Sequence, residues 1–184
     1  MKFLLHQLSL ILMFVTFLST GQISPKINVS EMDPDKSILK NTEDSKNHRT
    51  LLAVMRGANL DEVLGFDGPF TVFAPSDSAF DRLPRNQVAD LLKPENQQKL
   101  LKMMTYHIVA GNLSASKILR AMCQGRGKAT FTTVQGNEII ATMKGVDIIL
   151  NDSMGNSAKI TTADANQCNG VIHEIDRVIL PGDL

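Results

Sequence analysis

Hydrophobic residues change their spacing three times along the chain, and each change marks a boundary in the expected organisation. The first stretch is an almost unbroken apolar run of about 16 residues from Phe3 to Leu18, preceded by Lys2 and followed by small residues. This pattern is typical of a secretory signal peptide, so we expect residues 1–21 to be a signal that is cleaved after Gly21 or after Thr20. The alternative is an uncleaved membrane anchor, although the run is shorter than the ~20 residues that span a bilayer.

The second stretch, residues 22–46, carries nine charges and two prolines, and its scattered apolar residues follow no period. A segment of this composition buries too little apolar surface to offset the entropy that ordering removes. We therefore predict a disordered linker over residues 22–46.

From Asn47 onwards the apolar residues first recur at helical spacing. Ser76 and Asp77 are each good N-cap residues for a helix that stops at Pro84, and Pro94 suits the first turn of another helix. Ser114 caps a further helix. The expected helical segments are 51–57, 60–64, 76–83, 86–92, 95–106 and 114–124.

After Gly127 the apolar period changes to two residues, which predicts strands joined by hairpin turns. One earlier strand interrupts the helices, and its alternation places Phe70, Val72 and Ala74 on one buried face. The expected strands are 70–74, 129–134, 138–143, 146–151, 158–162 and 171–180. Helices followed by an antiparallel meander indicate an α+β fold and a single domain over residues 47–182.

The charge balance excludes one class of partner. Nineteen basic and nineteen acidic side chains give a formal net charge of zero over 184 residues, and loss of residues 1–21 removes only Lys2 from this count. A neutral chain lacks the cationic surface that attracts phosphate, so we expect no nucleic-acid partner. Any binding by such a chain has to depend on local loop shape and a few side chains.

Cys123 and Cys168 are the two cysteines. In a secreted protein two thiols more often pair than stay free, so a disulfide between them is expected as one possibility. A zinc site is disfavoured, because two isolated cysteines lack the paired spacing of zinc ligands.

Three segments, here called boxes, carry a family resemblance: Gly68–Phe80 (GPFTVFAPSDSAF), the pair Tyr106-His107, and Asn169–Pro181 (NGVIHEIDRVILP). In this order they resemble the fasciclin-type adhesion domain, which is repeated in periostin and keratoepithelin and occurs singly in secreted bacterial proteins. The resemblance covers about residues 47–182 and implies a fasciclin-like wedge of two β-sheets with helices packed around one side. The motif residues expected to have structural roles are Thr71, Phe73, Pro75, Asp77, Phe80, Asn169, Gly170 and His173.

His107 and His173 each fall on an apolar face of their element. We expect buried imidazoles that hydrogen-bond to the backbone. The alternative is a metal pair or a catalytic base, but no third ligand and no nucleophile can be identified beside them. The motifs of zinc proteases, phosphate-binding loops and serine hydrolases are incomplete or missing, so we expect no catalytic residue, no metal and no cofactor.

The resemblance also indicates where binding residues lie. In animal members, integrin-recognition stretches include the tyrosine–histidine region and an acidic loop just before the last box. These correspond here to Tyr106-His107 and to the loop that carries Asp164, although Ala165 replaces the isoleucine of the animal pattern. Tyr106, His107 and Asp164 are therefore the candidate binding residues. The expected partner is an extracellular protein, a matrix or cell-surface component or a polysaccharide, with membrane contact only through the signal peptide.

Two alternatives stay open beside the adhesion hypothesis. One is a carrier of a small apolar ligand in a cleft between the two sheets, and the other, less favoured, is an enzyme that uses His107 or His173. Asn28, Asn112 and Asn151 head N-x-S triplets, which matter only if the source glycosylates its secreted proteins.

Overall fold

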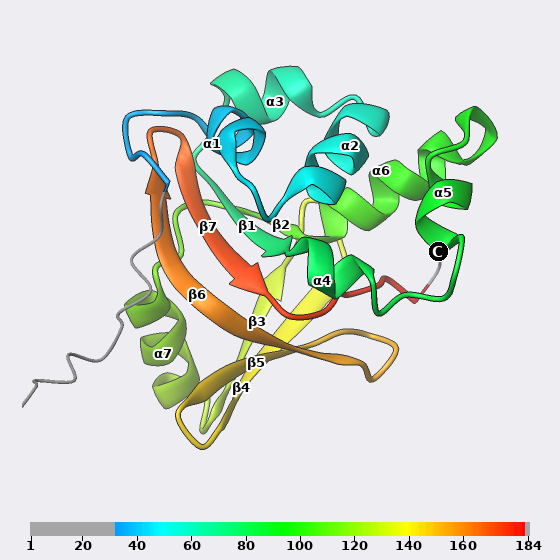
Figure 1. The fold of residues 1–184 in the computed structure, drawn as a ribbon. Helices are drawn as coiled ribbons and strands as arrows, with labels where there is room; N and C mark the ends of the chain where they lie inside the picture. The colour runs from blue at the N-terminus through cyan, green and yellow to red at the C-terminus, as the bar shows by residue number, and fades with distance from the viewer. Residues whose placement is uncertain (1–31, 183–184) are drawn as a thin grey trace, which may run out of the picture.

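The computed structural model describes residues 32–182, so the predicted signal peptide and residues 22–31 of the predicted linker lie outside the described residues. Helices dominate the first half of the chain and strands the second half (Figure 1). The helices are α1 (Ile38–Asp44), α2 (Arg49–Gly57), α3 (Asp61–Phe66), α4 (Asp77–Phe80), α5 (Gln87–Leu91), the 3-10 helix η1 (Pro94–Asn96), α6 (Gln97–Tyr106) and α7 (Ala115–Gln124). The strands are β1 (Phe70–Pro75), β2 (Ile108–Ala110), β3 (Lys128–Thr132), β4 (Glu138–Lys144), β5 (Asp147–Asn151), β6 (Ser157–Gln167) and β7 (Gly170–Ile175). Over residues 32–182, every helix is too short or too polar to cross a bilayer.

The strands form one sheet in the order β2-β1-β7-β6-β5-β4-β3. Neighbours are antiparallel except β1 and β7, which run parallel. The 11-residue β6 belongs to both halves of the sheet, and register shifts between Ile160 and Ala165 let it bend from one half into the other (Figure 1). At the two edges, the Val134 N–H donates to the Ile108 carbonyl over 2.7 Å. The sheet is therefore nearly closed. The predicted α+β fold with helices around one side is confirmed, and the two predicted sheets are joined through β6 into one.

Two clusters of buried side chains lie on opposite sides of β1 and β7. The first packs the helices against the sheet and includes Ile38, Leu51, Val72, Leu100 and Ile172. The second fills the interior of the nearly closed sheet and includes Phe73, Tyr106, Ile139, Leu150 and Ile175.

Strand β1 lies between these two clusters and is buried on both faces. Val72 and Ala74 face the helices, whereas Phe73, also with no exposed surface, belongs to the second cluster. The predicted face of Val72 and Ala74 is buried, and the opposite face is buried as well, because each face of β1 packs against one of the two clusters.

Short-range signals predicted the helix starts well. The Ser76 hydroxyl accepts from the Ala79 N–H over 3.3 Å and caps α4, and the Ser114 hydroxyl accepts from Lys117 N–H and caps α7. Pro94 opens η1, which leads directly into α6. These three predictions are confirmed.

The predicted linker is wrong over residues 32–46, which are packed into the domain. Ser37 caps α1, and the Ile38 side chain that follows has no exposed surface. Ile38 N–H donates to the Asn169 side chain over 2.8 Å, and Cys168 N–H donates to the Lys36 carbonyl over 3.0 Å. The charges of this segment lie on its solvent side, and its few apolar residues suffice because the rest of the domain supplies their partners.

The last predicted strand, 171–180, is shorter than expected, since β7 ends at Ile175. Beyond β7, backbone N–H groups donate to side chains instead of to a neighbouring strand. Ile179 N–H donates to His107 Nε2 over 3.2 Å, and Leu180 N–H donates to an Asp152 carboxylate oxygen over 3.0 Å. The sequence also gave no sign of β2, whose three residues look like a continuation of α6.

The expected disulfide is not formed, because Cys123 and Cys168 are both free and exposed. Cys123 lies in the last turn of α7, which packs on β3 and β4. Cys168 lies in the turn from β6 to β7, beside the Lys36 backbone. The two thiols therefore belong to regions that pack against different parts of the molecule.

Candidate functional site

Asn169 connects three segments through hydrogen bonds to their backbones. Its side-chain oxygen accepts from Ile38 N–H, and its side-chain nitrogen donates to the carbonyls of Leu64 and Asp67, both over 2.9 Å. Its own carbonyl accepts from Phe70 N–H over 3.0 Å. The first residue of the last box therefore joins α1, α3 and the start of β1.

Asp77 caps a helix other than the one it begins. Its carboxylate accepts from Thr50 N–H over 2.8 Å and from Arg49 N–H over 3.4 Å, at the start of α2. Burial alone raises the pKa of Asp77, but the hydrogen bonds from Thr50 and Arg49 outweigh it and hold that pKa below its ordinary value. Asp77 is thus ionised at neutral pH and stabilises the N-terminus of α2.

His107 is buried at the junction of α6 and β2. Its Nδ1 donates to the Met103 carbonyl over 2.8 Å, and its Nε2 accepts from Ile179 N–H. Because one ring nitrogen must donate and the other must accept, the neutral Nδ1–H tautomer fits this environment. Burial lowers the pKa of His107 to about 4.

His173 has no exposed surface and stacks on Phe73, with ring centroids 5.8 Å apart. Its Nε2 donates to the Leu113 carbonyl over 2.7 Å, and its Nδ1 accepts from Asp164 N–H over 3.2 Å. Burial lowers its pKa, so the ring is neutral at physiological pH. Both histidines have the backbone-bonded environment expected of a structural role.

Tyr106 is also buried, with its ring inside the second cluster. Its hydroxyl donates to the Glu138 carbonyl over 2.9 Å and accepts from Ser153 N–H over 3.2 Å. The expectation that Tyr106 and His107 belong to a binding surface is therefore wrong, since neither ring reaches solvent. Their apolar bodies and satisfied polar atoms make both of them parts of the core.

Asp164 is the exposed member of the three candidate binding residues. Its backbone adopts a left-handed conformation with φ of 59°, and its Oδ1 accepts from Ala115 N–H, the first residue of α7, over 2.7 Å. The Asp164 side chain thus links β6 to the start of α7. Its second carboxylate oxygen makes no hydrogen bond to any residue in the part of the chain described.

The structure also assembles a cluster that no sequence motif indicated. His48 Nδ1 lies 2.7 Å from the Ser45 hydroxyl, and His48 Nε2 lies 3.5 Å from a Glu174 carboxylate oxygen without a hydrogen bond. This is a serine–histidine–carboxylate array, but the His48 ring is only 4% exposed and Ser45 also accepts from Asn47 N–H. Burial lowers the pKa of His48, against the opposing charges of Glu174 and Asp77. The array holds the connection between α1 and α2 against β7.

Hollows open at the surface of the part of the chain that the structure describes. The first, here called the outer groove, has a volume of about 1030 Å³ and crosses the outer face of β4, β5 and β6. Its lining includes Thr142, Lys144, Asp147, Asn151, Lys159 and Arg177. Over residues 32–182, no three His, Cys, Asp or Glu side chains are placed to hold a metal ion.

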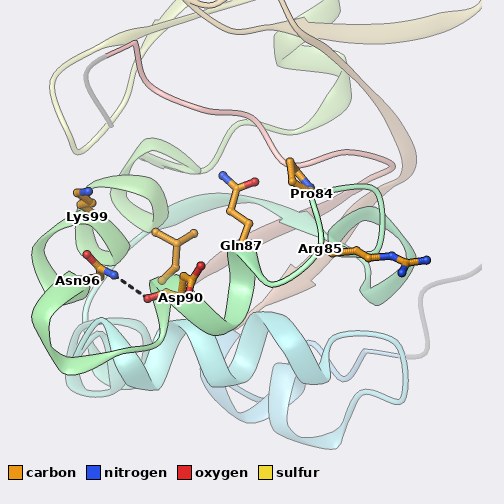
Figure 2. A pocket seen from close by; sticks show the side chains of 7 residues that line it. Pro84, Arg85, Gln87, Asp90, Asn96 and Lys99 are labelled. Carbon is orange, nitrogen blue, oxygen red and sulfur yellow. Dashed lines mark hydrogen bonds between the residues drawn. The ribbon is translucent and has the colours of Figure 1, made fainter.

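The second hollow has a volume of about 480 Å³ and lies between the turn at Pro84 and the start of α6. Figure 2 shows Asp90 of α5 facing Asn96, whose side-chain nitrogen donates to the Asp90 carbonyl over 2.8 Å. Arg85 extends to the opposite side from Lys99 (Figure 2). This α5–α6 hollow is lined mostly by polar side chains, with Pro84 and buried Leu91 beside them, and contains none of the predicted binding residues.

The buried histidines predict a loss of stability in mild acid. His107 has a pKa of about 4 in the folded protein and an ordinary value of 6.5, so between these values the unfolded chain binds a proton that the folded chain does not. The contribution of the neutral His107 ring to the free energy of unfolding is fully present above pH 6.5. It falls by on the order of 3 kcal/mol as the pH decreases to about 4. The lowered pKa values of His48 and His173 act in the same direction.

Urea unfolding midpoints at about pH 7 and about pH 4.5 should show this loss, and NMR titration should find the His107 ring unprotonated at the lower value. Equal midpoints, or a His107 ring that titrates near its ordinary pKa, would contradict the prediction.

Comparison with known proteins identifies the family. The family model of the fasciclin domain matches residues 46–181. Protein sll1483 of Synechocystis is 35% identical over 168 residues, which cover 89% of this chain and 84% of that protein. Human periostin is 37% identical over 121 residues, which cover 65% of this chain and 13% of periostin. A solved FAS1 domain pair from the insect cell adhesion molecule fasciclin I matches with a TM-score of 0.62 at 16% identity, over 82% of this chain and 52% of that chain. With a match that extends from the start of α2 to the end of the described strands, this chain belongs to the fasciclin domain family.

Proposed function

We propose that this protein is a secreted, non-enzymatic binding module that attaches to a cell surface or to extracellular matrix through its exposed loops and strand faces. Membership of the fasciclin domain family supports the proposal, as does the similarity of the fold to a structure from a cell adhesion molecule. The predicted signal peptide over residues 1–21 supports export from the cell.

The observation that carries the proposal is the inward orientation of the polar side chains in the three boxes. Asp77, Tyr106, His107, Asn169 and His173 all hydrogen-bond to backbone groups of other segments. Side chains used in this way build a rigid scaffold. Recognition is then left to the exposed residues that the scaffold displays, as is usual for binding loops on a stable framework.

The carrier alternative has less support. It requires a cleft between the two halves of the sheet, and this interior is filled by the second cluster of buried side chains. The outer groove and the α5–α6 hollow both lie on the outside and carry mostly polar side chains.

The proposal is tested with beads that display many copies of the mature protein, because one weak module gains avidity from multivalent display. Beads with folded protein should attach to cells or matrix from the source organism, and beads with heat-denatured protein should not. Equal attachment of beads with folded and with denatured protein would reject the proposal.

Asp164→Asn should separate a binding role from a structural one. The asparagine amide oxygen can still accept from Ala115 N–H, and asparagine tolerates the left-handed backbone at this position. We expect stability to stay within about 0.5 kcal/mol of the original protein and adhesion to fall by about fivefold, because one charged contact is lost.

Asp81→Asn is the matched control, since it removes the same charge from an exposed residue just after α4. Adhesion that is equal for both variants and the original protein would reject a role for Asp164 and leave the adhesion module itself in place.

A further inference from the structure

The outer groove carries two cationic side chains that form no ion pair within the described residues. Its carboxylates are already neutralised: Asp147 pairs with Lys159 at 3.1 Å, and Asp176 pairs with Arg82 at 3.2 Å. Lys144 and Arg177 line the same groove, are exposed, and form no ion pair with any residue between 32 and 182.

The surroundings of these cations add to the positive character of this face. Both oxygens of Asp176 are engaged, because the second one accepts from Lys159 N–H over 2.7 Å. Lys128 of β3 is exposed and lies opposite Thr142 in the register with β4. A chain with balanced total charge therefore presents a locally cationic groove, which attracts an anionic ligand.

In the same groove, a row of hydrogen bonds crosses β4, β5 and β6. The Ser157 hydroxyl donates to Asn151 Oδ1 over 2.8 Å, and Asn151 Nδ2 donates to the Thr142 hydroxyl oxygen over 3.0 Å. The Thr142 O–H is therefore left to donate and the Ser157 oxygen to accept. Half-buried Ile149, opposite both Thr142 and Lys159 in register, adds an apolar surface beside this row.

We propose that the outer groove binds an acidic polysaccharide. Carboxylate or sulfate groups of the glycan pair with Lys144 and Arg177, and its hydroxyls exchange hydrogen bonds with Thr142 and Ser157. The volume of about 1030 Å³ is large for one small molecule and suits a chain of several sugars. None of the residues that line the groove is aromatic, so bases of single-stranded nucleic acid would have no ring to stack on. The inference rests on the proposed function and names the class of its partner.

The test measures binding of the mature protein to polygalacturonate, dextran sulfate, uncharged dextran and a single-stranded DNA oligonucleotide. The first two polymers distinguish a preference for carboxylate from one for sulfate. The double variant Lys144→Gln with Arg177→Gln removes both unpaired cations. Its matched control, Arg85→Gln with Lys99→Gln, removes the same charge from the α5–α6 hollow (Figure 2).

We expect tight binding to at least one acidic glycan, weaker binding to DNA and none to dextran. Affinity for that glycan should fall by about tenfold in the groove variant and by less than about twofold in the control variant, with unchanged melting temperatures. Equal losses in the two variants, equal affinity for DNA, or no binding to either acidic glycan would overturn the inference.

Adhesion of beads that carry the groove variant separates this inference from the proposed function. Full adhesion by a protein that binds no acidic glycan would reject the polysaccharide and keep the adhesion module. Glycan binding in solution without any adhesion of folded protein would reject the adhesion module and keep the groove.

Discussion

Replacing Gly170 with alanine is expected to lower the free energy of unfolding by on the order of 5 kcal/mol, the largest effect among the changes proposed for this protein. A Cβ at this position would lie 2.0 Å from the Phe70 carbonyl oxygen and 2.9 Å from the Phe70 nitrogen. Gly170 and Phe70 are direct partners in the parallel pair of β7 and β1, and Phe70 also pairs with Ala110 of β2. The obstructing atoms are backbone atoms held from both sides, so they cannot rotate away. The φ of 155° adds strain for any residue with a side chain.

Two other glycines give matched controls for the same substitution. Gly65→Ala should be neutral or slightly stabilising, because Gly65 lies in α3 and its Cβ would make an ordinary contact at 3.6 Å with the Leu39 side chain. Gly136→Ala should cost about 1 to 2 kcal/mol, because its φ is 100° but nothing lies within 4 Å of the new Cβ. Urea unfolding midpoints should rank Gly65, Gly136 and Gly170 in that order of increasing damage. A midpoint for Gly170→Ala equal to that of Gly136→Ala would mean that β1 and β7 shift apart at little cost.

Features that depend on a few neighbouring residues were predictable from the sequence. Ser76 and Ser114 cap the helices that follow them, and the change to a two-residue period after Gly127 marks the start of the meander. Each of these signals acts within one turn or one strand. The family resemblance supplied what such signals lack, namely the arrangement of these elements as a wedge.

Features that depend on distant partners were not predictable. Asp77 caps α2 from 27 residues away, and Asn169 binds the Ile38 backbone from 131 residues away. Without these contacts the polar segment over residues 32–46 looks like a linker, and the three residues of β2 look like the end of a helix.

The prediction of the candidate site was limited in the same way, because its side chains also depend on distant partners. Tyr106 and His107 are amphipathic side chains that suit either a surface or a core with hydrogen-bond partners, and their partners Glu138, Ser153 and Ile179 come from later in the chain. The outer groove depends on the register of three strands, which no single segment of sequence specifies.

Replacing His173 with alanine is expected to lower the free energy of unfolding by about 4 kcal/mol. The imidazole has no exposed surface, so its removal leaves a cavity beside Phe73. It also takes away the partner of the Leu113 carbonyl and of the Asp164 N–H. Each of these backbone groups then loses a hydrogen bond in a partly buried position, which adds to the cost of the cavity.

The loss should be local before it is global, since His173 holds both segments that meet at the start of α7. Hydrogen exchange should speed up at Asp164 and at Ala115, whose N–H depends on the Asp164 carboxylate, before exchange rises in β4 and β5. Phe66→Ala is the control for loss of a ring, because Phe66 is 88% exposed and its removal should change stability by less than about 0.5 kcal/mol. A melting temperature for His173→Ala equal to that of Phe66→Ala would contradict the buried, doubly bonded imidazole. In that case His173 would not hold this part of β6, and the position of Asp164 would have to depend on its contact with α7 alone.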